Sequence, residues 1–287
     1  MNQCTIGKRV TYSGIALHTG VRAQLAFMPA PVNTGVWFQR VDLPGKPRVQ
    51  AIATNVTAVM RGTTIESGIA KVCTVEHILA ALSANGIDNV IVEMDDVEPT
   101  IADGSSLPFV EMIERVGVIE QDVPRRIFEV DRVYEYCNGD TKVRLEPHDC
   151  FKISCKVQYN ETVLDKQEFE TDITAKTFRN ELCEARTFCL YREIEGLMNA
   201  GLIKGGSLDN AVVIKDGVIL SKDGVRYPNE IVRHKMLDIV GDIYLLGCQI
   251  KGHYIAERPG HPSNVALAQL IIKENPEFFS FLNSEIK

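Results

Sequence analysis

Apolar and polar residues alternate along FKISCKVQY, residues 151–159, and this period of two restricts the segment to a strand with one buried face. The apolar set is Phe151, Ile153, Cys155, Val157 and Tyr159. The polar set is Lys152, Ser154, Lys156 and Gln158. This pattern is typical of an antiparallel sheet that packs on a core through one face and leaves the other in water.

Two further pairs of strand patterns are joined by dipeptides that favour tight turns. VYEYCNGDTKVRLEP (133–147) predicts a hairpin that turns at Asn138-Gly139, and AVVIKDGVIL (211–220) predicts one that turns at Asp216-Gly217. Asn-Gly and Asp-Gly supply the left-handed backbone that two-residue hairpin turns need. The chain is therefore expected to be rich in antiparallel strands.

Several segments instead repeat their apolar residues with the period of a helix. TVEHILAALSANG (74–86) predicts a helix with Thr74 as its N-cap, and SLPFVEMIERVG (106–117) predicts one that ends at a glycine. A further helix is expected to begin after Pro228-Asn229. The other helical segments are REIEGLMNAG (192–201) and PSNVALAQLIIKEN (262–275).

Strand and helix patterns do not alternate regularly, which argues against a parallel βαβ fold and favours an α+β fold with antiparallel sheets and packed helices. The polar stretch EQDVPRR (120–126) is the predicted linker. It divides the 287 residues into an N-terminal half, 1–121, and a C-terminal half, 127–287.

Charge and composition exclude several classes of protein. The formal net charge is −7 without a basic cluster, so a nucleic-acid-binding protein is not expected. No apolar run is long enough for a membrane span, and the N-terminus lacks the apolar core of a secretory signal, so a cytoplasmic protein is expected. The eight cysteines include no C-x-x-C pair and are expected to be reduced thiols.

The segment EIVRHKMLDIVGD (230–242) places His234, Asp238 and Asp242 at four-residue intervals on an otherwise largely apolar helix. Residues four apart are neighbours on one helix face. An isolated His-x-x-x-Asp would be interpreted as a solvated surface pair. Because Asp242 extends the stripe and Lys235 lies beside it, a polar site beneath a core helix is favoured.

His77 follows Glu76 on the helix predicted for 74–86, opposite its apolar face. The surrounding residues on that side are Ala80, Ala81 and Ala84, not lysine and glutamate. Alanine is also a strong helix former, so propensity alone could explain it. The alternative interpretation, which we follow, is that another layer approaches closely on the side of His77.

His261 lies in RPGHPSNVAL, at a predicted turn before the last long helix. His77, His234 and Asp238 together offer two neutral nitrogens and one carboxylate, the donor set of a catalytic zinc site with an open position. Glu76 and His261 then remain for proton transfer.

These motifs occur together with others in a recognisable order. The chain resembles the UDP-3-O-acyl-N-acetylglucosamine deacetylases, zinc amidases that act at the committed step of lipid A synthesis. The matching segments are SGIALHTG (13–20), CTVEHILAALSANGIDN (73–89), DGSSLPFVEMI (103–113), EARTFCL (184–190), KGGSLDNAVV (204–213), YPNEIVRHKMLDIVGDIYLLG (227–247) and PGHPSN (259–264).

The resemblance implies a zinc-dependent hydrolysis of the 2-acetamido group, with iron(II) as an alternative metal in the cell. It implies that the zinc ligands are His77, His234 and Asp238. It assigns Glu76 as general base and His261 as general acid. Asp242 would orient His261, and Thr187 in ARTF would hydrogen-bond the oxyanion.

The resemblance also implies where the substrate, a UDP-linked acylated amino sugar, is bound. Lys235 and Phe188 would contact its sugar or nucleotide. An insert at about 192–218 would form an apolar passage for the acyl chain, and Ile194, Gly206 and Ser207 match its motif. The implied fold has two α+β halves of related topology with the site between them. A monomer without stable membrane insertion is expected.

Two other classes of protein compete with this interpretation. A non-haem iron(II) oxygenase also uses two histidines and a carboxylate. A glutamate beside a ligand argues against it, because hydrolysis needs a base there and oxygenation does not. A non-catalytic protein stabilised by a metal would need neither an open coordination position nor Glu76.

Overall fold

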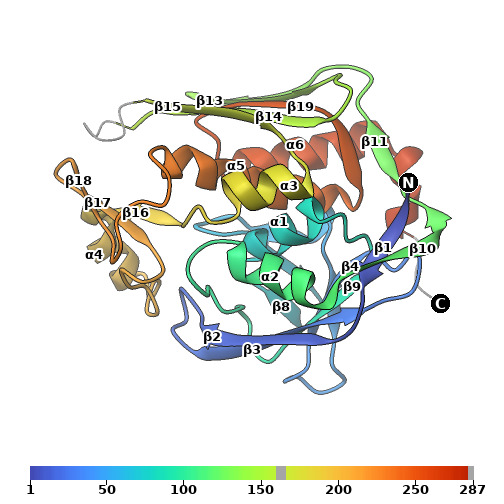
Figure 1. Cartoon of the computed structure of the whole chain (residues 1–287), viewed down its shortest axis with the longest axis horizontal. Coiled ribbons are helices and arrows are strands. Elements are labelled where there is room, and N and C mark those ends of the chain that lie inside the picture. Colours follow the sequence, from blue (N-terminus) through green and yellow to red (C-terminus); the bar gives the residue numbers. More distant parts are fainter. Residues whose placement is uncertain (160–165, 284–287) are drawn as a thin grey trace.

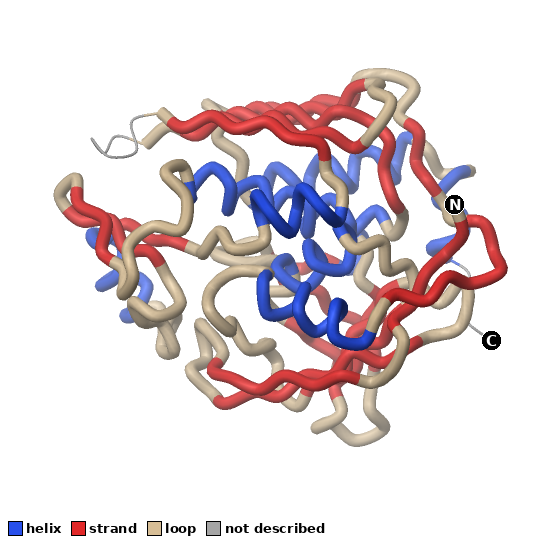
Figure 2. The backbone as a smooth tube through the Cα atoms, in the orientation of Figure 1, coloured by secondary structure: helices blue, strands red, loops and turns tan. Residues whose placement is uncertain are grey.

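Two sheets form the outer layers of the molecule and the main helices lie between them, as the computed structural model of residues 1–159 and 166–283 shows (Figure 1). In Figure 2 the helices run through the middle of the molecule, with a sheet above them and a sheet below. The helices are α1 (Glu76–Ala84), α2 (Leu107–Val116), α3 (Ala175–Thr177), α4 (Tyr191–Asn199), α5 (Glu230–Ile243) and α6 (His261–Glu274). This arrangement confirms the α+β fold class.

The two large sheets have the same topology. The N-terminal sheet has the order β2 (Val10–Ile15), β3 (Arg22–Pro29), β9 (Val90–Met94), β4 (Val36–Arg40), β5 (Arg48–Gln50). The C-terminal sheet has the order β12 (Tyr134–Asn138), β13 (Thr141–Glu146), β19 (Gln249–Glu257), β14 (Phe151–Val157), β15 (Gln167–Asp172), and β11 (Ile127–Glu129) also pairs with β19.

In both sheets only one neighbouring pair within the five-strand order is parallel. β9 runs parallel to β4 in the first sheet, and β19 runs parallel to β14 in the second. The other neighbours in the two orders are antiparallel. The expected relation between the topologies of the two halves is therefore confirmed.

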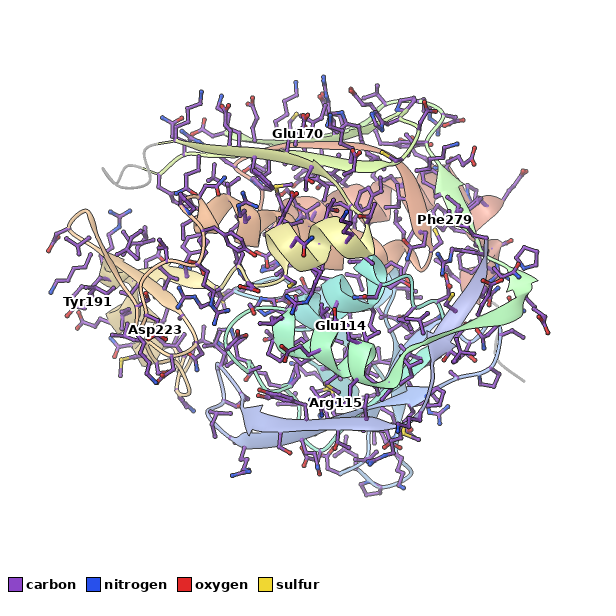
Figure 3. The ribbon with its side chains drawn as sticks, viewed as in Figure 1. Glu114, Arg115, Glu170, Tyr191, Asp223 and Phe279 are labelled. Atoms are coloured by element: carbon purple, nitrogen blue, oxygen red, sulfur yellow. The ribbon has the colours of Figure 1, made fainter. Side chains whose placement is uncertain are left out.

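Each half also carries a small three-stranded sheet. The first contains β6 (Val56–Ala58), β7 (Thr64–Ser67) and β8 (Ala70–Val72); the second contains β16 (Phe188–Leu190), β17 (Val212–Lys215) and β18 (Val218–Leu220). The β17–β18 hairpin turns at Asp216-Gly217, with φ of 49° and 75°, as the sequence predicts. The second small sheet and α4 form the projection at the left of Figure 1, where Figure 3 labels Tyr191 and Asp223.

The alternation in residues 151–157 becomes strand β14 with one buried face. Phe151, Ile153, Cys155 and Val157 are buried, and the residues between them are half-buried. Figure 3 shows Glu170 of the adjacent strand β15 on the outer side of the sheet, away from the helices. The strand ends at Val157, two residues before the end of the alternating pattern.

Helices α1 and α5 pack closely through their polar stripes. A Cβ atom added to Gly241 of α5 would lie 2.1 Å from the carbonyl oxygen of Glu76, so only glycine allows this approach. Every residue of α1 is buried, including His77, Ala80 and Ala81. The prediction of a second layer beside the alanine face is confirmed, and this layer is α5.

Three local predictions are wrong. Val75, not Thr74, precedes α1 as its N-cap, and Thr74 adopts a φ of 54°. The first hairpin turns at Gly139-Asp140, because Asn138 pairs with Thr141. His261 is the first residue of α6, so it does not lie in a turn before that helix.

The predicted linker 120–126 is not a free connection. Most of it belongs to strand β10 (Val118–Pro124), which pairs antiparallel with β1 (Asn2–Ile6). β10 is mostly exposed, so its polar composition is compatible with a strand as well as with a linker. Backbone hydrogen bonding to β1, which the composition does not reveal, decides between the two.

The remaining short helical segments are η1 (Ala53–Asn55), η3 (Phe178–Leu182), η4 (Tyr244–Leu246) and η5 (Phe278–Asn283). All eight cysteines are free, as expected. Among the residues that the structure describes, no helix combines the length and the apolar character that crossing a membrane requires.

Candidate active site

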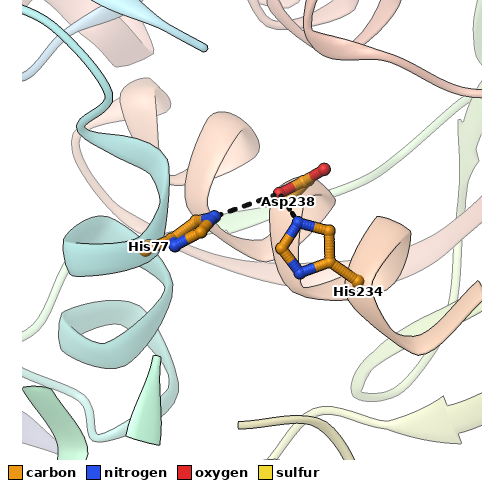
Figure 4. Close-up of side chains that lie close together, drawn as sticks. All are labelled: His77, His234 and Asp238. Carbon is orange, nitrogen blue, oxygen red and sulfur yellow. Dashed lines mark ion pairs between the residues drawn. The ribbon is translucent and has the colours of Figure 1, made fainter. Parts of the chain in front are cut away.

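His77, His234 and Asp238 meet where α1 and α5 pack together (Figure 4). Asp238 Oδ1 lies 3.4 Å from His234 Nε2 and 3.8 Å from His77 Nε2. His234 and Asp238 are one turn apart on α5, and His77 faces them from the first turn of α1. All three side chains are buried, and together they form a group that could hold a metal ion.

The protonation of these residues fits a metal. Ala185 O accepts a hydrogen bond from His234 Nδ1 at 3.0 Å, and because a carbonyl only accepts, the lone pair of this ring is on Nε2. Burial lowers the pKa of His77 to about 3 and lowers the pKa of His234, so both rings are neutral at pH 7.

The spacing of the ligand atoms also fits. Asp238 Oδ1 is buried without a hydrogen-bond partner, although it faces two ring nitrogens. Two ligand atoms each about 2.0–2.1 Å from a tetrahedral ion are separated by roughly 3.3–3.4 Å. The His234–Asp238 distance of 3.4 Å matches this separation, and a small adjustment brings His77 to it.

Glu76 precedes His77 in the chain and lines the same pocket. Its carboxylate accepts a hydrogen bond from the backbone N–H of Thr63 at 2.9 Å. Burial raises the pKa of Glu76 to about 7, and the charges of Asp242 and Asp238 act in the same direction. A carboxyl group with this pKa can both take and release a proton near neutral pH.

His261 stands on the other side of Glu76, with Nε2 at 3.9 Å from Glu76 Oε1. Its Nδ1 donates to Asp242 Oδ2 at 2.8 Å. Burial opposes the charge of His261, but Asp242 and Glu76 outweigh it and raise the pKa of His261 to about 10. This histidine is therefore a cation at neutral pH and can donate a proton.

Asp242 is fixed by two further hydrogen bonds. Thr63 Oγ1 donates to Asp242 Oδ1 at 2.6 Å, and Asn264 Nδ2 donates to Oδ2 at 2.9 Å. Asn264 Oδ1 in turn accepts from the hydroxyl of Tyr254 at 3.0 Å. Asp242 is fully buried, lies behind His261 and does not line the pocket.

Lys235, Phe188 and Thr187 line the same pocket. Lys235 Nζ donates to Asp238 Oδ2 at 3.0 Å and lies 5.4 Å from the centre of the Phe188 ring. Burial disfavours the charge of Lys235, but Asp238 outweighs this effect and raises its pKa. The backbone of Thr187 is held by Gly104 O, which accepts from its N–H, and by Val212 N–H, which donates to its carbonyl.

A second cavity adjoins this pocket and is mainly apolar. The two share Leu17, Arg61, Thr187, Phe188 and Cys189. Ile194, Gly206 and Ser207 line the second cavity, together with Leu197, Met198, Leu202, Ile203, Leu208 and Val213. The structure therefore brings the predicted polar residues into one pocket, except Asp242, which lies behind His261, and it places the insert residues in a cavity that adjoins this pocket.

Three residues with contacts in this region were not singled out in the sequence. Thr63 joins Glu76 to Asp242, and Arg61 pairs with Glu193 of α4 at 2.9 Å. Buried Glu98 accepts from Thr74 Oγ1 at 3.3 Å and from the backbone N–H of Thr19 at 2.8 Å. No local signal marks them, because their partners, except that of Thr63 at Glu76, are more than twenty residues away in the chain.

The site combines two histidines and a carboxylate around one point with a separate carboxyl group and a cationic histidine. These are the groups that a metal-dependent hydrolase uses. Comparison with known proteins agrees with this class. The chain matches the family UDP-3-O-acyl N-acetylglycosamine deacetylase over residues 3–273, and it belongs to this family.

Curated relatives of similar length carry the corresponding name. A UDP-3-O-acyl-N-acetylglucosamine deacetylase from Anaeromyxobacter sp. (strain Fw109-5) is 42% identical over 95% of this chain and 89% of the relative. Proteins of the same name from Acidithiobacillus ferrooxidans (strain ATCC 53993 / BNL-5-31) and Myxococcus xanthus (strain DK1622) are 39% and 38% identical. Each covers 95% of this chain, with 90% and 87% of the relative aligned.

Proposed function

We propose that this protein hydrolyses the 2-acetamido group of UDP-3-O-acyl-N-acetylglucosamine, giving UDP-3-O-acyl-glucosamine and acetate for lipid A synthesis. The observation that carries the proposal is the His77–His234–Asp238 donor set in one pocket with Glu76 and His261. The family and the names of the relatives support the substrate.

The metal we propose is zinc, with iron(II) as the alternative in the cell, held by His77, His234 and Asp238. When bound, it would supply Lewis acidity for the amide carbonyl and lower the pKa of a water molecule, an effect that reaches about 7 in zinc sites. Glu76, with its pKa raised to about 7, would accept a proton from the water molecule that attacks the carbonyl carbon.

The other residues act on the two ends of the breaking amide. The hydroxyl of Thr187 donates a hydrogen bond to the oxygen on which negative charge develops. His261, kept cationic by Asp242, donates a proton to the amine nitrogen as the C–N bond breaks. Amines are poor leaving groups without this proton, and His261 supplies it while Glu76 takes the proton of the attacking water.

The substrate is held on two sides of the pocket. Lys235 and Phe188 contact its sugar or nucleotide, and the acyl chain enters the apolar cavity lined by Ile194, Gly206 and Ser207. Residues 1–121 and 127–287 are the two units of the enzyme, and the second includes the insert at about 192–218. Because one chain supplies all of these residues, we infer that the enzyme is active as a monomer. We also propose that it acts in the cytoplasm.

The test is acetate release from UDP-3-O-acyl-N-acetylglucosamine by purified protein, stripped of metal and then restored with about one equivalent of zinc or iron(II). We expect activity to disappear on stripping and to return on restoration. Oxygen consumption without acetate release would indicate the oxygenase. Tight substrate binding without turnover, unaffected by Glu76→Gln, would indicate a non-catalytic binding protein.

A further inference from the structure

Arg186, which precedes the pocket residue Thr187, forms a fully buried ion pair with Glu230. The two residues are 2% and 1% exposed. Glu230 Oε1 accepts from the backbone N–H of Arg186 at 3.0 Å and from its Nε at 2.9 Å. Glu230 Oε2 accepts from Arg186 Nη2 at 3.2 Å and from the backbone N–H of Arg226 at 2.8 Å. The four lone-pair positions of this carboxylate are thus occupied.

The pair fixes the backbone of residues 185–187, which carries two groups of the site. Arg186 is preceded by Ala185, whose carbonyl orients the ring of His234, and followed by Thr187. Glu230 lies in the first turn of α5, one turn before His234 on the same face. A shift of the Arg186 backbone would therefore move the Thr187 hydroxyl and the acceptor of His234 together.

Stability alone is a weak reason for such a pair. Removing two charges from water is so costly that a buried ion pair is often no more stabilising than apolar residues of the same volume. The pair instead fixes the relative orientation of the two side chains, because a planar guanidinium bonds both oxygens of a carboxylate in only one orientation. Catalytic groups need this precision, since a displacement of about 1 Å can cost roughly 100-fold in rate.

We infer that Arg186 and Glu230 are positioning residues that hold residues 185–187 in register with α5, so that the Thr187 hydroxyl and the His234 ring keep their geometry at the metal. Neither residue lines the pocket, so both act through the segment that they hold. The Thr187 part of this inference rests on the proposed function, whereas the His234 part requires only that the site binds a metal.

The chain contains a matched control, the Arg125–Asp88 pair. Arg125 Nε and Nη2 donate to Asp88 Oδ2 at 3.0 and 2.8 Å, and Nη2 also donates to Gly86 O. Arg186 Nη2 donates to Gly224 O in the same way. Arg125 and Asp88 are 12% and 13% exposed, and neither residue lines the metal pocket. Arg→Lys at both positions therefore changes the same chemistry in two places.

The experiment measures zinc affinity of the stripped protein, kcat and KM at saturating zinc, and thermal stability. We expect Arg186→Lys to weaken zinc binding about tenfold, the lower end for loss of an outer-shell partner. We expect kcat to fall about 10- to 100-fold with KM within about twofold. Arg125→Lys should lower stability only. In a Thr187→Val background, the additional loss of kcat from Arg186→Lys should shrink to less than about twofold.

Unchanged zinc affinity and kcat in folded Arg186→Lys would overturn the inference. So would equal losses in Arg125→Lys, or a kcat loss as large in the Thr187→Val background as in the wild type. If Arg186→Lys does not fold, Glu230→Gln keeps the shape, removes the charge and carries the same expectations. If the wild-type protein releases no acetate, the proposed function fails and zinc affinity alone decides the role of the pair.

Discussion

The histidine pKa values are shifted in opposite directions at the two ends of the metal pocket. At one end, burial lowers the pKa values of His77 and His234 and leaves their rings neutral. At the other end, the His261 side chain is also largely enclosed, at 12% exposed, but Asp242 and Glu76 overcome the effect of burial and raise its pKa to about 10. The same residue type thus has the protonation state of a metal ligand in one place and that of an acid in the other.

The difference comes from where the carboxylates make their hydrogen bonds. Asp242 Oδ2 accepts directly from His261 Nδ1, so the cation is stabilised by contact. Asp238 faces two rings with an oxygen that accepts no hydrogen bond, and its other oxygen is occupied by Lys235. A carboxylate that faces two neutral rings can bind a metal ion together with them. A carboxylate that is hydrogen-bonded to a single ring stabilises the protonated form of that ring.

The largest expected effect comes from removing the shared carboxylate. Asp238→Ala should lose bound metal and reduce acetate release to the background of the assay, because the third ligand is lost and Lys235 loses its partner. Metal analysis and turnover are measured together. Asp209→Ala, which breaks an exposed ion pair with Lys222, should leave both unchanged. Full metal content in Asp238→Ala would show that this end is not the metal site.

The next largest effect is expected at the boundary between the two ends. Glu76→Gln keeps the size of the side chain but cannot accept a proton, so kcat should fall about 10²–10⁴-fold, the usual contribution of a general base. Bound metal should stay at one ion per chain, because Glu76 is not among the proposed ligands. Glu66→Gln, at a partly exposed residue of β7, is the matched control. A kcat close to that of the wild type would remove Glu76 from the mechanism.

Asp242→Asn tests the acid end by its pH dependence. His261 acts while protonated, so activity falls as pH rises through its pKa. Removing the Asp242 charge lowers this pKa, and the basic limb of the kcat profile should move to lower pH by at least about one unit. The acidic limb should move less. A basic limb that stays in place in Asp242→Asn would mean that another group sets it.

The smallest expected effect lies outside the polar pocket. A Cβ on Gly206 would be 3.1 Å from the carbonyl oxygen of Ile203 and 3.8 Å from Leu17 Cδ1, and both residues line the apolar cavity, so Gly206→Val narrows it. Excluding two methylenes of a long acyl chain corresponds to about 1.6 kcal/mol, or roughly tenfold in kcat/KM. A short-chain substrate should be spared. Gly196→Val, at an exposed glycine of α4 with open space around its Cβ position, is the control. Equal losses for both chain lengths would argue against an acyl passage at Gly206.

The sequence predicted most of the fold because its main signals are local. The period of β14, the Asp216-Gly217 turn and the helix after Asn229 each depend on neighbouring residues, and each is confirmed. The errors arise where a distant partner decides. The Thr74 hydroxyl donates to Glu98, twenty-four residues away, and does not cap α1. The polar segment 118–124 is a strand because it pairs with β1.

The polar site was predictable to the same extent. The four-residue spacing on α5 placed His234 and Asp238 together, and the alanine face of α1 indicated that a layer would meet His77. The hydrogen bonds that join distant parts of the chain around the site were not predictable. Thr63 donates to Asp242 across 179 residues and Arg186 donates to Glu230 across 44 residues, and no local pattern in the sequence pairs residues so far apart.

The contrast between the two ends is tested most directly by nitrogen-15 NMR of the histidine rings in zinc-loaded protein near neutral pH. The His261 signals are assigned by their absence in His261→Gln. His77 and His234 should each be neutral, with a proton on Nδ1 and zinc on Nε2, whereas His261 should carry protons on both nitrogens. A neutral His261, or a cationic ring at His77 or His234, would contradict the division of this pocket into a metal end and an acid end.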